Sequence, residues 1–161
     1  MPTYRFTVNG QARSVDTAPD RSLLEVLRED FDITGPKYGC GEGQCRACTV
    51  LMDGAPIVSC TTPVRAAVGR TIRTIESLAS NGTLHPVQQA FVDEGATQCG
   101  YCTPGMILRT VALLEKTPQP TEAQIVDGLN GNLCRCNGYP RIVAAVQLAS
   151  RLTARRGGSN D

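Results

Sequence analysis

The sequence has no tryptophan, few aromatic residues of any kind and a single histidine, His85. Aromatic residues make up 4% of the chain, although 41% of it is hydrophobic. Large rings therefore contribute little to the core, and another feature must help to hold the fold. His85 directly precedes Pro86 at an expected helix start, so we predict that it caps a helix or lies on the surface rather than binding a metal.

The sequence also lacks an excess of charge of one sign. It has 16 Lys and Arg residues against 15 Asp and Glu residues, which gives a net charge of +1, and the basic residues are scattered among acidic ones. Proteins that bind phosphate backbones need clustered cationic side chains. We therefore expect no nucleic-acid partner.

Long hydrophobic runs are absent. No segment approaches the roughly 20 apolar residues that a membrane helix requires. The chain passes directly from Met1 into the alternating pattern of Tyr4, Phe6 and Val8, which predicts no signal peptide. We expect no membrane span and a cytoplasmic location, with export as part of a complex left open.

What the sequence does have is eight cysteines among 161 residues. This share lies below the roughly 8–10% of small disulfide scaffolds, and no secretory signal accompanies it. The cysteines fall into two sets of four with none left over: Cys40, Cys45, Cys48 and Cys60, then Cys99, Cys102, Cys134 and Cys136. Two separate sets of four indicate two four-thiolate metal sites rather than a disulfide framework.

The first half of the chain is predicted to be mainly β-structure with one helix. Residues 3–8 alternate, Asn9-Gly10 is a strong hairpin signal, and a second strand follows toward Val15. Asp20 is expected to cap a helix over residues 21–30, whose buried face is leucine-rich. Further strands are predicted over residues 49–52, 57–59 and 71–75. We assign residues 1–76 to this domain.

The second half is predicted to be entirely helical. Residues 77–83 are small and polar and form the expected linker. Helical periodicity follows over residues 86–94, 104–116, 121–129 and 140–154, so we assign residues 84–154 to a helical domain. Residues 155–161 offer no apolar anchor and are expected to be a disordered tail. The fold class is therefore α+β, with the two kinds of structure separated along the chain.

The first cysteine set has the plant-type ferredoxin spacing for a [2Fe-2S] cluster, Cys40-x4-Cys45-x2-Cys48, completed by Cys60. Nearby glycines allow the backbone to wrap and direct amide N–H groups at the sulfurs. A structural zinc site is the alternative, but zinc motifs usually pair two short Cys-x2-Cys hooks. A Rieske centre is excluded, because it needs two histidines.

The second set combines two close pairs, Cys99-x2-Cys102 and Cys134-x-Cys136. The first pair alone is also typical of thiol-disulfide oxidoreductases, but the second pair completes four thiolates. Each pair directly precedes an expected helix, so two helix N-termini point toward one place, where their partial positive charge suits an anionic cluster. Zinc remains an alternative for this set.

Three segments carry a resemblance to a known family. Residues 38–50 read YGCGEGQCRACTV, residues 98–106 read QCGYCTPGM, and residues 130–139 read NGNLCRCNGY. They closely resemble the iron–sulfur subunit of the xanthine dehydrogenase family of molybdenum hydroxylases, over residues 3–154 and all eight cysteines. The resemblance implies a β-grasp, plant-ferredoxin-like domain followed by an all-α four-helix domain, each with one [2Fe-2S] cluster.

The resemblance also implies roles for individual residues. Cys99, Cys102, Cys134 and Cys136 would bind the cluster near molybdenum, and Cys40, Cys45, Cys48 and Cys60 the distal one. Gln98 and Cys136 match positions that contact the pterin. Arg46 stands where the family commonly has glycine, and we predict that its cation raises the reduction potential of the first cluster.

The implied function is electron transfer within a heteromeric molybdenum hydroxylase. Electrons would pass from molybdopterin on a large subunit to FAD on a medium subunit, or to heme on a cytochrome c subunit. The substrate, an aldehyde, an N-heterocycle or a similar compound, would bind to the large subunit, and no catalytic residue is expected on this chain. The alternatives are a free-standing ferredoxin-type carrier and a two-zinc structural module.

Overall fold

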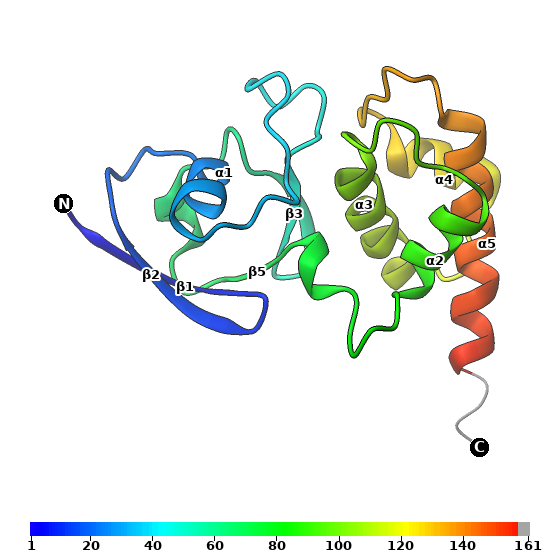
Figure 1. Ribbon diagram of the computed structural model, residues 1–161, viewed down its shortest axis with the longest axis horizontal. Helices are drawn as coiled ribbons and strands as arrows, with labels where there is room; N and C mark the ends of the chain where they lie inside the picture. The colour runs from blue at the N-terminus through cyan, green and yellow to red at the C-terminus, as the bar shows by residue number, and fades with distance from the viewer. Residues whose placement is uncertain (158–161) are drawn as a thin grey trace.

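The computed structural model describes residues 1–157, with side chains to residue 155. Its first half is a five-stranded mixed sheet with the strand order β2-β1-β5-β3-β4 (Figure 1). The strands are β1 (Thr3–Val8), β2 (Gln11–Asp16), β3 (Thr49–Met52), β4 (Ala55–Val58) and β5 (Thr71–Arg73). β1 and β5 are parallel, whereas β1–β2, β3–β4 and β3–β5 are antiparallel. The α+β fold class is confirmed.

Two hairpins follow from the turn residues in the sequence. Asn9 and Gly10 both have positive φ, +51° and +79°, as do Asp53 and Gly54, at +49° and +82°. A two-residue turn with positive φ at both positions matches the twist of the strands that it joins. The registers place Val8 opposite Gln11 and Met52 opposite Ala55.

One helical segment covers the sheet, formed by α1 (Leu23–Glu25) and a π-helical continuation, Val26–Asp30. Its N-cap is Ser22, whose hydroxyl accepts from the Glu25 N–H at 3.2 Å, while the Glu25 carboxylate accepts from the Ser22 N–H. The expected cap Asp20 is therefore wrong, because Ser22 and Glu25 satisfy each other's backbone donors. Short 3-10 turns at Val64–Ala67 and Ile75–Ser77 complete this half.

The second half contains four helices, as predicted: α2 (Pro86–Asp93), α3 (Thr103–Lys116), α4 (Glu122–Leu129) and α5 (Tyr139–Gly157). His85 caps α2, since its Nδ1 accepts from the Val87 N–H at 3.2 Å, which confirms the capping role. α5 continues to Gly157, so the expectation of a disordered tail is wrong for residues 155–157. Residues 158–161, which complete that expected tail, lie outside the described residues.

β3 joins the two halves through the alternation of its side chains. Val50 packs into the core under α1, while the next residue, Leu51, is buried in the core of the helical half. Successive residues of a strand point to opposite faces, so one strand contributes to both cores. α3 lies alongside β3 as a result (Figure 1). Between the halves, Ser80 and Thr83 pair across the Asn81-Gly82 turn within the expected linker.

Candidate metal centres

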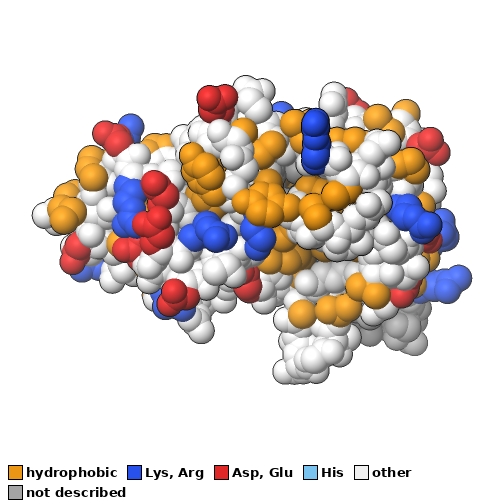
Figure 2. Space-filling model, turned by 45° about the horizontal axis from the view of Figure 1, so that its top comes forward, with side chains coloured by type: hydrophobic (Ala, Val, Ile, Leu, Met, Phe, Trp, Pro, Cys, Tyr) orange, Lys and Arg blue, Asp and Glu red, His pale blue; other side chains and the backbone are white. Residues whose placement is uncertain are grey.

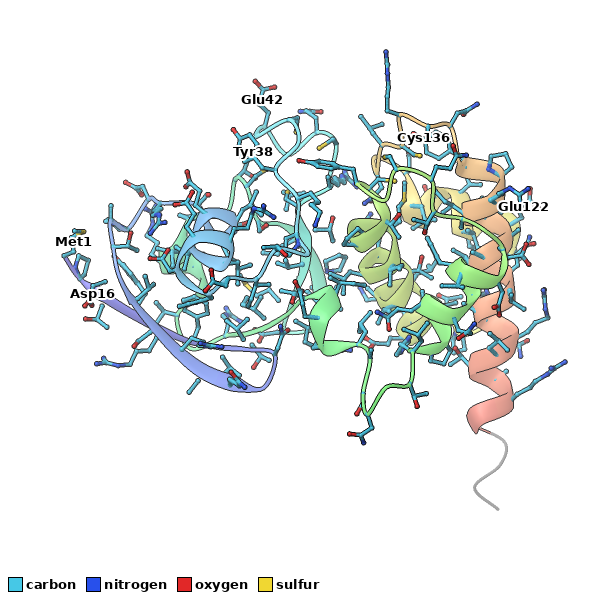
Figure 3. All side chains as sticks on the ribbon, viewed as in Figure 1. Met1, Asp16, Tyr38, Glu42, Glu122 and Cys136 are labelled. Atoms are coloured by element: carbon cyan, nitrogen blue, oxygen red, sulfur yellow. The ribbon has the colours of Figure 1, made fainter. Side chains whose placement is uncertain are left out.

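The cysteine-bearing loops gather along one edge of the molecule. The loop before β3, the loop before α3 and the loop before α5 all reach the upper edge in Figure 1. Tyr38, Glu42 and Cys136 mark this edge in Figure 3. Residues nearly 100 positions apart in the chain are therefore brought to one surface.

The first loop is shaped around the Cys40 sulfur. Cys40 Sγ accepts backbone N–H groups from Glu42 at 3.4 Å, Gln44 at 3.2 Å and Cys45 at 3.3 Å. Gly41 and Gly43 make this wrapping possible, because both have positive φ, +71° and +74°. These backbone N–H groups lower the pKa of the Cys40 thiol to about 7 and favour the thiolate that binds metal.

Cys48 and Cys60 form the second thiol pair of this set. Cys48 is buried, and burial raises the pKa of its thiol to about 11, with the neighbouring Cys60 thiol contributing. Cys60 follows β4, and Cys48 immediately precedes β3, so the β3–β4 hairpin brings them together. The buried Cys48 thiol, with its raised pKa, becomes a thiolate when a metal cation replaces its proton.

The second set forms at the N-termini of two helices. Cys102 is the N-cap of α3, and burial raises the pKa of its thiol to about 12, with Cys134 as its neighbour. The Cys134 sulfur accepts the Gly138 N–H at 3.4 Å, just before α5. The Tyr101 N–H lowers the pKa of the Cys99 thiol, which neighbours that of Cys136.

Within each set of four cysteines, the thiol groups are nearest neighbours in pairs. The neighbouring pairs are Cys40 with Cys45, Cys48 with Cys60, Cys99 with Cys136, and Cys102 with Cys134. Tetrahedral zinc draws four ligands to one point, whereas the four thiolates of a [2Fe-2S] cluster are shared by two irons. The donor set therefore fits two [2Fe-2S] clusters.

The two sets are linked directly to each other. The Leu133 N–H donates to the Cys45 carbonyl at 3.0 Å, and the Tyr101 hydroxyl donates to the Tyr38 carbonyl. A cavity of about 400 Å³ lies between the sets and is lined by cysteines from both, including Cys40, Cys45, Cys99, Cys102 and Cys134.

Comparison with known proteins agrees with this arrangement. Residues 6–68 match a family described as a 2Fe-2S iron-sulfur cluster binding domain, and residues 74–147 match a family described as a [2Fe-2S] binding domain. The nicotinate dehydrogenase small FeS subunit of Eubacterium barkeri is 50% identical over 147 residues, covering 91% of this chain and 94% of the relative. The chain belongs to the iron–sulfur small-subunit family of the molybdenum hydroxylases.

Other members of this small-subunit family are similarly close. The nicotine 6-hydroxylase small subunit of Paenarthrobacter nicotinovorans is 48% identical over 139 residues, covering 86% of this chain and 84% of the relative. A chain in the crystal structure of quinoline 2-oxidoreductase from Pseudomonas putida 86 superimposes with a TM-score of 0.92 at 39% identity, covering 97% of each chain. The ferredoxin-like sheet domain and the helical domain, each binding one [2Fe-2S] cluster, are thereby confirmed.

The surface of this small subunit is apolar around its cysteines. Tyr38, Tyr101, Leu133 and Tyr139 are large hydrophobic side chains that remain exposed next to them. Figure 2 shows hydrophobic side chains in a band across the middle of this face, with acidic groups mainly toward its periphery. Gln98 is also exposed, beside Cys99. Contiguous exposed apolar surface of this kind marks an interaction site.

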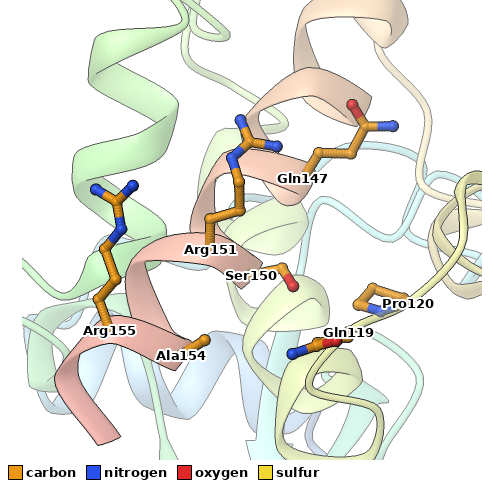
Figure 4. A pocket seen from close by; sticks show the side chains of 7 residues that line it. All are labelled: Gln119, Pro120, Gln147, Ser150, Arg151, Ala154 and Arg155. Carbon is orange, nitrogen blue, oxygen red and sulfur yellow. The ribbon is translucent and has the colours of Figure 1, made fainter. Parts of the chain in front are cut away.

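A second hollow lies away from the cysteines. This pocket of about 480 Å³ is lined by Gln119, Gln147, Arg151 and Arg155, between α5 and the segment before α4 (Figure 4). No cysteine lines this pocket, so it is separate from the proposed cluster sites.

None of the described helices is long and apolar enough to cross a membrane.

Sequence reasoning missed the contacts that join the two sets. The Arg46 guanidinium donates to the Asn130 carbonyl at 2.8 Å, across the domain boundary, and the Tyr101 hydroxyl also crosses it. Arg46 has a φ of +58°, a left-handed conformation that costs a residue with a Cβ about 1–2 kcal/mol. Glycine adopts this conformation without strain. The resemblance, which implies glycine at position 46, was the one signal in the sequence that Arg46 is unusual.

Proposed function

We propose that this chain carries electrons, one at a time, from a molybdopterin site on a larger partner subunit to FAD or heme on another partner. Electrons enter at the set Cys99, Cys102, Cys134 and Cys136. They leave from the set Cys40, Cys45, Cys48 and Cys60. When bound, each [2Fe-2S] cluster supplies a centre that accepts and releases one electron.

The observation that carries this proposal is the hydrogen bond between Leu133 and Cys45. Leu133 is bonded directly to Cys134, and its N–H donates to the carbonyl of Cys45 at 3.0 Å. A ligand of one proposed cluster is therefore joined to a ligand of the other through one intervening residue and one hydrogen bond. This continuity favours a relay between two centres, rather than two sites that function independently.

The protein's own residues prepare both ends of the relay. At Cys40, three N–H donors compensate negative charge on the sulfur. At the other end, Gln98 and Cys136 lie at the apolar, exposed edge, where we propose that they contact the pterin of the large subunit. Substrate binding belongs to that partner. We propose an N-heterocycle as the substrate, because the similar proteins named above belong to a nicotinate dehydrogenase, a nicotine hydroxylase and a quinoline oxidoreductase.

The cluster assignment is tested on the purified complex. We expect about four irons and about four acid-labile sulfides per chain, two clusters of two each, with two distinct EPR signals after reduction. Half those amounts in intact protein would contradict the two-cluster assignment. A colourless protein containing zinc would support the structural-module alternative, because zinc thiolate sites do not absorb visible light.

The direction of transfer is tested with two matched variants of the complex, Cys60→Ala and Cys136→Ala. Each is expected to lose one EPR signal and keep the other. In the Cys60→Ala complex, substrate still reduces the remaining cluster, but electrons no longer reach the acceptor. In the Cys136→Ala complex, substrate reduces neither the remaining cluster nor the acceptor. Rapid-freeze EPR during substrate addition measures this. The proposed order would be refuted by the reverse pattern, in which substrate reduces the remaining cluster of Cys136→Ala but not that of Cys60→Ala.

A further inference from the structure

Arg46 reaches from the first cysteine loop into the helical domain. Its guanidinium donates to the Asn130 carbonyl at 2.8 Å. The same group lies flat against Gly131, where an added Cβ would come within 2.6 Å of Arg46 Cζ and 2.8 Å of its Nη1. The turn after α4 therefore provides both an acceptor and a side-chain-free surface for this guanidinium.

The backbone around Arg46 is held by the same turn. The Arg46 carbonyl accepts the Asn132 side-chain amide at 3.4 Å, and the preceding Cys45 carbonyl accepts the Leu133 N–H at 3.0 Å. α3 also approaches closely, since a Cβ on Gly105 would lie 2.7 Å from the Arg46 carbonyl oxygen. Two consecutive residues of the first cysteine loop thus make three polar links to residues 130–133.

Arg109 provides a comparison within the same region. It donates from Nε to the Gly128 carbonyl at 2.8 Å, so it too binds the end of α4, but both partners belong to the helical domain. Burial and the neighbouring Arg46 cation lower the pKa of Arg109. Among the described residues neither arginine forms an ion pair, so both are held through carbonyl oxygens. Of these two arginines, Arg46 is the one whose hydrogen bond crosses between the domains.

We propose that Arg46 is a positioning residue, which anchors the first cysteine loop to residues 130–133 and thereby fixes the separation and orientation of the two cysteine sets. Cys45 stands directly before Arg46, and Cys134 follows the anchored turn, so movement at this contact moves a proposed ligand on each side. The inference rests on the proposed ligation of clusters by both sets. It is distinct from an effect of the Arg46 charge on the potential of the first cluster.

The test compares Arg46→Gly with Arg109→Gln in the intact complex. Glycine adopts the positive φ of position 46 without strain, so this variant removes the side-chain anchor while leaving the loop conformation accessible. EPR measures the magnetic interaction between the two reduced clusters, which depends on their separation and orientation. Hydrogen exchange with mass spectrometry measures protection of the peptide that contains residues 130–133.

We expect Arg46→Gly to alter or lose the magnetic splitting and to speed exchange of this peptide about tenfold, the effect of losing one charge-assisted hydrogen bond. Arg109→Gln is expected to keep the wild-type splitting. The proposal is overturned if Arg46→Gly keeps both the splitting and the protection, or if Arg109→Gln changes the splitting equally. Failure of the cluster assignment itself looks different, because one EPR signal and half of the iron would be missing in the wild type.

Discussion

Gly105 lies where the helical domain closely approaches the first cysteine loop. It is buried in the first turn of α3, and a Cβ there would lie 2.7 Å from the Arg46 carbonyl oxygen. Ordinary contact begins at 3.4 Å, so the substitution Gly105→Ala requires α3 and the loop to separate by about 0.7 Å. That carbonyl also accepts the Thr49 N–H at 3.1 Å and the Thr49 hydroxyl at 2.7 Å, which restrains it from moving.

The sizes of two opposing energies decide whether Gly105→Ala stabilises or destabilises the chain. Replacing glycine with alanine in a helix contributes at most about 1 kcal/mol of stability, and less in the first turn. Overpacking against a restrained backbone atom costs about 1–3 kcal/mol. The net expectation for Gly105→Ala is a loss of about 1–2 kcal/mol in the free energy of unfolding.

Gly128→Ala in α4 is the matched control. The three atoms nearest to its added Cβ all belong to Leu113, with Cδ2 at 3.0 Å and Cδ1 at 3.1 Å, and this flexible side chain can move aside. We expect Gly128→Ala to leave stability unchanged or to raise it by up to about 1 kcal/mol. The two variants should therefore differ by about 2 kcal/mol, or about 4–8 °C in Tm for a chain of this size.

The assay is thermal unfolding of the cluster-loaded chain, followed by far-ultraviolet circular dichroism at one fixed scan rate for wild type and both variants. A fixed rate is needed because loss of the clusters makes unfolding irreversible. If Gly105→Ala unfolds at or above the temperature of Gly128→Ala, the close contact between α3 and the Arg46 carbonyl does not restrain the domains.

Three further predictions use other parts of the molecule. Arg46→Gly should lower the reduction potential of the first cluster in a redox titration, because a cation stabilises the more negative reduced state; an unchanged potential would show that the charge has no such effect. Phe91→Ala should destabilise the chain by about 3–5 kcal/mol in urea unfolding, since Phe91 is fully buried, whereas exposed Val92→Ala should change stability by less than about 0.5 kcal/mol. In cluster-free, reduced protein at pH 7, iodoacetamide should alkylate Cys40 at least about 100 times faster than Cys48. The reason is that the Cys48 thiol is buried and has a pKa of about 11, whereas the pKa of the Cys40 thiol is about 7. Peptide mass spectrometry measures the two rates, and similar rates would contradict this difference in environment.

Local patterns predicted the local structure well. The Asn9-Gly10 turn forms as expected, and Asp53-Gly54 forms a second turn of the same kind, because both residues of each turn adopt positive φ, which these residue types favour. The four helices of the second half lie where apolar periodicity indicates them. At the first helix the expected cap Asp20 was wrong, because Ser22 caps the helix through its reciprocal bonds with Glu25. The error at the C-terminus arose because α5 continues beyond the last apolar residue of its buried face.

The sequence by itself determined the chemistry of this protein. The spacing of eight cysteines, together with the glycines beside them, predicts two four-thiolate sites, since the spacing of cysteines close together in the chain is a local property. Only the tertiary structure decided how the sites are related: which thiols are neighbours, that Leu133 bonds to Cys45, and that Arg46 crosses to Asn130. The contacts of Cys99 with Cys136, Cys45 with Leu133 and Arg46 with Asn130 join residues 37, 88 and 84 positions apart. No sequence period encodes such distances. The contacts depend on β3 contributing to both cores, which docks the domains and brings the cysteine loops to one edge.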